Sequence, residues 1–129
     1  MKMIVLLMVA AALHTCQPDK ELWKEAIAYN KESKQLLKDL KDPINELVQK
    51  ANRINVQGRA LSKAEMGKVD AYDLARAEYE HWVNNMPKLP KKGQRKTADV
   101  NKVVTEQKAY RDALKSLKRW VGELSGQNH

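Results

Sequence analysis

Few side chains in this chain of 129 residues are of a type and spacing that could do chemistry. Asp70 and Asp73 stand three positions apart on one face of a predicted helix, and paired carboxylates can do acid–base work when burial separates their pKa values. Basic residues lie near them in the sequence, so solvated helix surface is the favoured interpretation. His81 has no second His or Cys at a spacing typical of metal ligands. We therefore predict no catalytic residue, no metal site and no cofactor.

A stronger candidate is the cation-rich stretch "PKLPKKGQRK", residues 87–96. Its two prolines and its glycine predict a loop between two helices. Five side chains in it could bind phosphates or carboxylates: Lys88, Lys91, Lys92, Arg95 and Lys96. The alternative is a solvated loop whose lysines serve only solubility. No aromatic residue is interleaved with the cations, and no nucleic-acid partner is expected.

The composition of the whole chain also favours anionic partners. Lys and Arg number 24 against 16 Asp and Glu, which gives a formal net charge of +8. Such an excess favours anionic partners without choosing among phosphates, acidic polysaccharides, lipid headgroups and nucleic acids. Hydrophobic residues at 43% and charged residues at 31% are typical of a small globular or helical-bundle protein rather than of a disordered chain.

The only cysteine, Cys16, follows a short apolar segment. After Lys2, residues 4–13 form an unbroken apolar run of ten residues. As a helix this run would span about 15 Å, half of the roughly 30 Å hydrocarbon core of a bilayer, so it fits a secretory signal better than a transmembrane helix. Cleavage after Ala10-Ala11-Ala12, before Leu13, would give a secreted protein without a lipid. A buried structural cysteine is a further alternative.

The stretch Leu13-His14-Thr15-Cys16 resembles the lipobox of bacterial lipoprotein precursors. In that family the cysteine thiol receives a diacylglyceryl group, the signal is cut just before the cysteine, and the new N-terminus is acylated. Leu13 and Cys16 match the motif, whereas His14 and Thr15 depart from the small residues usual there. The resemblance implies a signal peptide over residues 1–15, lipidation at Cys16, and a mature domain over residues 16–129.

The same resemblance implies a location. In Gram-negative lipoproteins, acidic residues directly after the cysteine tend to retain the protein at the inner membrane, and Gln17 stands there in this chain. The implied location is the outer membrane, with the domain facing the periplasm. The resemblance implies the membrane as a partner, through the lipid anchor, and the basic loop adds anionic envelope components as further expected partners. Residues 81–90, "HWVNNMPKLP", are similar to the helix end and loop of small helical envelope lipoproteins, but no functional residue is transferred from that similarity.

Three helices are predicted after the signal, over about 20–56, 63–86 and 98–124. The apolar stripe of the first keeps its phase across Asp42-Pro43, which favours one helix kinked at Pro43 over a new helix capped by Asp42. Its N-terminal part is expected to project as a stalk toward the membrane. Ser62 and Glu65 have the spacing of a capping box at the start of the second helix, whose predicted inner face begins with Met66.

The third helix, with Thr97 as its expected cap, carries the most regular pattern. Eight positions on one face follow a heptad spacing of alternating three and four residues: Val100, Val103, Gln107, Tyr110, Leu114, Leu117, Val121 and Leu124. Three amphipathic helices with short connections predict an all-α, elongated, antiparallel three-helix bundle.

The predicted function is that of a membrane-anchored helical envelope lipoprotein with a binding or structural role, and not of an enzyme. One alternative is a secreted, soluble helical binding protein without a lipid anchor. Another is a helical enzyme or enzyme accessory factor that uses His81 and the face of Asp70 and Asp73.

Overall fold

A computed structural model describes residues 19–56 and 58–126 of the chain. It contains the α-helices α2 (Asp19–Asn55), α3 (Lys63–Asn84) and α4 (Val100–Gly126), and the short 3-10 helix η1 (Lys92–Gln94). The described residues contain no strand. Cys16 and the predicted signal of residues 1–15, with both predicted cleavage sites, lie outside the described residues.

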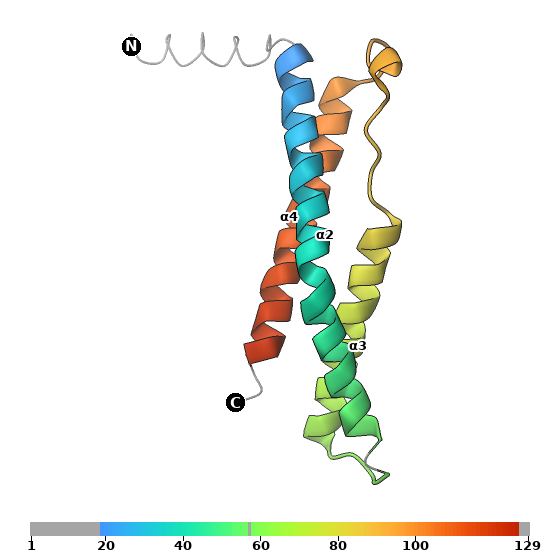
Figure 1. Cartoon of the computed structure of the whole chain (residues 1–129), viewed down its shortest axis with the longest axis vertical. Coiled ribbons are helices and arrows are strands. Elements are labelled where there is room, and N and C mark those ends of the chain that lie inside the picture. Colours follow the sequence, from blue (N-terminus) through green and yellow to red (C-terminus); the bar gives the residue numbers. More distant parts are fainter. Residues whose placement is uncertain (1–18, 57, 127–129) are drawn as a thin grey trace, which may run out of the picture.

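The three helices form an elongated bundle (Figure 1). In that view α2 runs down the length of the molecule, α3 returns upward beside its lower half, and α4 runs down again. Consecutive helices are therefore antiparallel, as predicted, while α2 and α4 are parallel. α4 packs most extensively on α2 and least on α3. Between α3 and α4, residues 85–99 lead upward to the end of the bundle at which α2 begins (Figure 1).

α2 continues as a single helix through Pro43, so the alternative of a new helix at this proline is wrong. A proline removes one backbone donor and crowds the preceding turn, which usually breaks or bends a helix. Here Leu40 and Ile44 on either side of Pro43 are buried in the core, and their packing keeps both halves of the helix in place. The ribbon of α2 leans away from the vertical in its lower half (Figure 1).

The turn between α2 and α3 follows the predicted signals. Gly58 has a φ of 66°, a left-handed conformation that glycine adopts without the strain of a side chain. The capping box of α3 is confirmed: Ser62 Oγ accepts from the Glu65 backbone N–H at 3.2 Å, and a Glu65 carboxylate oxygen accepts from the Ser62 N–H at 3.1 Å.

α4 starts two residues later than predicted, and Thr97 does not cap it. Asp99 is the cap, because its Oδ1 accepts from the backbone N–H groups of Asn101 and Lys102 at 3.1 and 3.3 Å. The hydroxyl of Thr97 instead donates to the Gln94 carbonyl, which holds residue 97 in the turn after η1.

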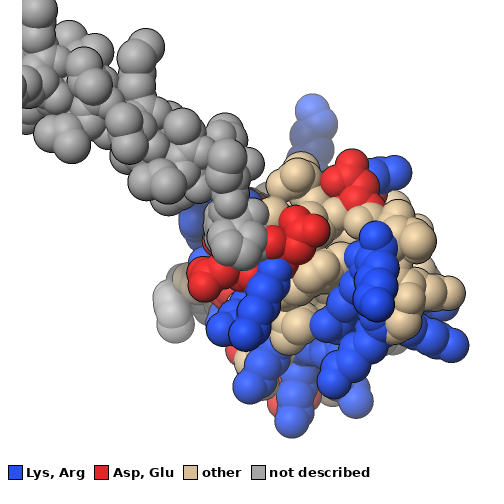
Figure 2. All heavy atoms as spheres, turned by 90° about the horizontal axis from the view of Figure 1, so that it is seen from above, with Lys and Arg blue, Asp and Glu red and all other residues tan. Residues whose placement is uncertain are grey.

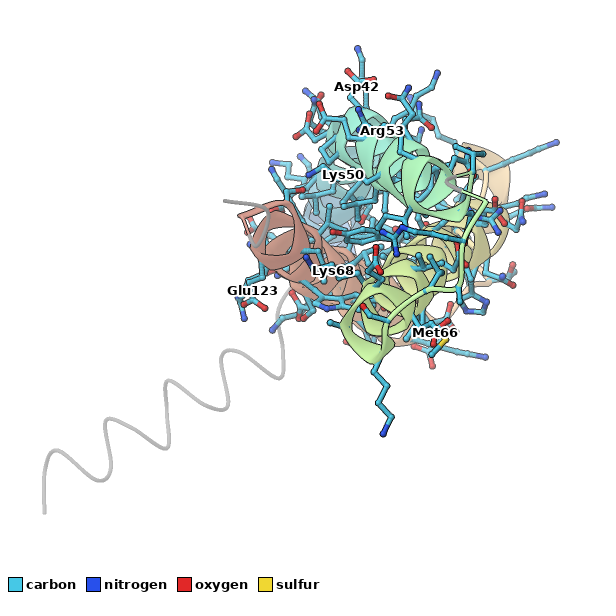
Figure 3. The ribbon with its side chains drawn as sticks, turned by 90° about the horizontal axis from the view of Figure 1, so that it is seen from below. Asp42, Lys50, Arg53, Met66, Lys68 and Glu123 are labelled. Carbon is cyan, nitrogen blue, oxygen red and sulfur yellow. The ribbon has the colours of Figure 1, made fainter. Side chains whose placement is uncertain are left out.

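The core runs along the axis of the bundle, and the heptad stripe of α4 provides much of it. Of its eight predicted positions only Val103 is not buried. α3 contributes Val69, Tyr72 and Ala75. Met66 was expected on the inner face of α3, but it is 46% exposed and points outward in Figure 3. It lies in the first turn of α3, below the last turns of α4 in Figure 1, where no third helix covers it.

The N-terminal part of α2 does not project as a stalk. Ala26, Asn30 and Ser33 are buried there, and this part of α2 contacts α4 through Gln107 and the segment 85–99 through Arg95. The amide of Asn30 donates to the Gln107 side chain of α4 at 3.2 Å. The upper half of the bundle therefore has its own polar contact, in addition to the apolar core below it.

Candidate functional site

The predicted basic loop forms part of the connection between α3 and α4. Pro87 and Pro90 cannot continue the backbone ladder of α3, and Lys91 has the extended dihedral angles φ −63° and ψ 152°. The chain then turns through η1 at the upper end of the molecule (Figure 1). The extended part thus carries the cations from the end of α3 toward the start of α2.

Arg95 fastens this loop to α2. Its guanidinium carbon lies 5.3 Å from the centroid of the Trp23 ring, a cation–π arrangement. Its Nε donates to the Pro90 carbonyl at 3.4 Å, which joins the two ends of the turn. Arg95 is therefore only half exposed, and its main contacts are with the protein itself.

Three other cations of the loop face solvent. Lys91, Lys92 and Lys96 are all exposed, and within residues 19–56 and 58–126 none of them belongs to a salt bridge. Figure 2, which looks down on the upper end, shows Lys and Arg side chains gathered around it. These three lysines are accessible to bind an anion.

Lys88 is separated from the other four cations. It lines a cleft of about 550 Å³ with Asn30 and Lys34 of α2 and with Met86 and Leu89 of the connection. Asn30 is eleven residues into α2, which places this cleft about 16 Å along the helix from Asp19. The predicted five-residue cluster therefore divides into a group at the end of the bundle and one lysine on its side.

A buried chain of amides fixes the path of the connection. Gln107 accepts from Asn30 of α2 and donates through its Nε2 to the Pro87 carbonyl at 3.0 Å. Gln107 is 1% exposed, so its bond with Asn30 lies away from water, while its bond to the Pro87 carbonyl is partly buried. The buried hydroxyl of Ser33, in the same part of α2, has no hydrogen-bond partner among the residues that the structure describes. The sequence signal for this contact was the polar Gln107 at a core position of the heptad stripe.

Ion pairs join α2 to α4 along one side of the bundle. Arg111 donates to the Glu32 carboxylate at 2.9 Å, and its guanidinium carbon lies 4.6 Å from the centroid of the Tyr29 ring. The hydrogen bond from Arg111, helped by one from Lys115, holds the pKa of Glu32 below its usual value. These groups pair with one another, and we regard them as structural.

The residues considered for catalysis do not come together. Asp70, Asp73 and His81 are all exposed on α3. Asp70 and His81 stand eleven residues apart on that helix, which separates them by about 16 Å along its axis. His81 packs edge-on against Trp82, with ring centroids 4.9 Å apart, and its Nδ1 lies 3.3 Å from the side-chain amide of Asn85.

The described part of the chain contains no cluster of three His, Cys, Asp or Glu side chains that could hold a metal ion. Among the described helices, none is both long enough and apolar enough to cross a bilayer.

No family model matches the chain, and comparisons with curated proteins and with solved structures give no significant match.

Proposed function

We propose that this protein is a lipid-anchored helical component of a bacterial cell envelope, with Cys16 as its acylated residue and the three-helix bundle as its exposed domain. The observation that carries the proposal is the order of features in the sequence. A basic residue, an apolar run of ten residues, the stretch Leu13-His14-Thr15-Cys16 and then a polar chain follow one another within 20 residues.

The position of Cys16 supports the same proposal. It precedes Asp19, the first residue of α2, by only three positions. An acyl anchor at Cys16 would hold one defined end of a rigid bundle at the membrane. Several acyl chains anchor a protein more firmly than one, since each buried CH₂ contributes about 0.8 kcal/mol. With Gln17 rather than an acidic residue after the cysteine, we propose the outer membrane, with the bundle facing the periplasm.

The proposed role is binding or structural rather than catalytic. It is supported by the separation of His81 from the pair Asp70 and Asp73, and by the exposure of all three. A protein secreted without a lipid is the second candidate, and the small residues Ala10-Ala11-Ala12 favour it.

Incorporation of labelled palmitate tests the proposal. Wild-type protein expressed in a bacterium with the lipoprotein pathway should be labelled, and Cys16→Ser should remain an unlabelled, larger precursor. The matched control is the double variant Cys16→Ser with Ser116→Cys, which restores a thiol at an exposed position of α4. It should also be unlabelled, because the position and not merely the thiol is recognised. Unlabelled wild type, or equal label in all three proteins, would refute the proposal.

A further inference from the structure

The basic loop and the start of α2 lie at the same end of the bundle, and this shared position is not visible in the sequence. The stacking of Arg95 on Trp23 establishes it, because Trp23 is in the second turn of α2 and Arg95 follows η1 directly. Figure 1 shows both segments at the upper end.

Covalent geometry then limits how far this end can lie from Cys16. Asp19 lies three positions after Cys16, and even a fully extended chain covers at most about 3.6 Å per residue, or about 11 Å in total. That distance is close to the Debye length of about 10 Å at 0.1 M salt. If Cys16 carries the anchor of the proposed function, on which this inference rests, the start of α2 lies within about one Debye length of the anchored residue, and Arg95 holds the loop beside that start.

The positive charge of this end comes from the loop rather than from α2. In the first turns of α2, Lys20 and Lys24 are offset by three acidic residues, Asp19, Glu21 and Glu25. From residue 91 to residue 99 there are four basic residues and one acidic residue, Asp99, whose carboxylate caps α4. Figure 2 shows both groups, with basic side chains predominating around the end of the bundle.

We propose that this end of the bundle is a membrane-docking surface, in which Lys91, Lys92 and Lys96 contact the anionic phospholipid headgroups of the bilayer that holds the anchor. The three lysines are exposed and unpaired within the described ranges, and Arg95 holds the loop beside the start of α2. Basic residues beside an anionic membrane surface are attracted to it within a Debye length.

The opposite end of the molecule provides a matched control. α2 contains 37 residues, so its far end lies about 55 Å from its start, several Debye lengths away. Arg53, Lys63 and Lys68 are at that lower end and are exposed (Figure 3 labels Arg53 and Lys68). Substituting three cations at either end changes the formal net charge equally, from +8 to +5.

The experiment measures adsorption of the full chain to lipid vesicles in a Cys16→Ser background, where no acyl group can contribute. The loop variant is Lys91→Gln, Lys92→Gln, Lys96→Gln, and the control variant is Arg53→Gln, Lys63→Gln, Lys68→Gln. Arg95 is left in place because it packs on Trp23. Each protein is sedimented with vesicles of equimolar phosphatidylglycerol and phosphatidylcholine, and with vesicles of phosphatidylcholine alone. The apolar run of residues 4–13 is present in every protein, so its contribution cancels between them.

The loop variant should bind the anionic vesicles about 10- to 100-fold more weakly than the parent, since each cation near such a surface strengthens adsorption by up to about fivefold. The control variant should bind within about twofold of the parent, and added salt should abolish the difference.

Equal losses in the two variants would show that net charge alone drives adsorption, and equal binding of the parent to both vesicle types would show no electrostatic docking. Either result overturns the proposed surface, whereas unlabelled wild type in the palmitate experiment overturns only the anchor.

Discussion

At the scale of single residues, the carboxylate of Glu65 both pairs with Arg59 and accepts a hydrogen bond from the Ser62 backbone. The hydrogen bond from Arg59, and then the backbone N–H of Ser62, lower the pKa of Glu65 from 4.5 to about 2. The same side chain completes the capping box of α3. Because the folded state holds this carboxylate ionised, the stabilisation is present above pH 4.5 and is lost as the pH falls toward 2.

Glu65→Gln should therefore make the bundle less sensitive to acid. Glutamine can still accept from the Ser62 N–H, but it carries no charge for Arg59 to stabilise. We expect the thermal midpoint of the wild type to fall more steeply than that of the variant between about pH 5 and pH 2, because only the wild type must protonate residue 65.

Circular dichroism melts at several pH values measure this difference. Asp70→Asn removes an exposed carboxylate from the same helix and should follow the wild-type profile. Parallel profiles for the wild type and Glu65→Gln would show that Glu65 contributes no pH-dependent stability.

Residue contacts were predictable from the sequence only where they are local. Ser62 and Glu65 were identified because a capping box has a fixed spacing of three. Trp23 and Arg95 are far apart in the sequence, and nothing in either residue indicates which ring a loop arginine will meet. The partner of Gln107 was equally unpredictable: Gln107 was placed in the heptad stripe, but nothing in its position indicates that it will meet Asn30 of α2.

At the scale of elements, α4 is the helix on which the bundle depends most. Its buried stripe meets both other helices, and Leu114 and Leu117 are 0% and 1% exposed. Burial of such side chains is the main favourable term in folding, so the loss of either should be costly.

Leu114→Ala or Leu117→Ala should lower the free energy of unfolding by about 2–5 kcal/mol, because each leaves a cavity in a closely packed core. Ser116→Ala, on the exposed side of the same helix, should change it by less than about 0.5 kcal/mol. It is a cleaner control than Lys115→Ala, since Lys115 pairs with Glu32 at 3.3 Å.

Chemical denaturation followed by circular dichroism measures these changes in the free energy of unfolding. If all three α4 variants unfold at the same denaturant concentration, this face of α4 is not the core of the bundle.

The helices themselves could be predicted well because their apolar spacing is regular over many turns. The heptad stripe of α4 and the uninterrupted phase of α2 across Pro43 both match the structure. Boundaries were less predictable, because Thr97 and Asp99 are both good capping residues and only the observed hydrogen bonds select Asp99. Met66 was misplaced because its spacing indicates a face of α3 but not where along the bundle that face is covered.

At the scale of the whole molecule, the two ends of the bundle differ in charge and in what connects to them. The sequence identified the five cations of the loop but not their distribution. Pro87 and Pro90 keep the connection extended, so Lys88 remains beside a cleft on the side of the bundle while the other four continue to the start of α2. The position of the basic loop beside the start of α2 thus depends on the tertiary path of residues 85–99.

The most direct test of the lipid-anchored account is the intact mass of the protein isolated from the membrane fraction of a bacterium that expresses the full chain. The account predicts a mature chain that starts at Cys16 and carries the added mass of a diacylglyceryl group and an N-terminal acyl chain. A chain that starts at Leu13 with an unmodified Cys16 would contradict it, and would assign the protein to the secreted class instead.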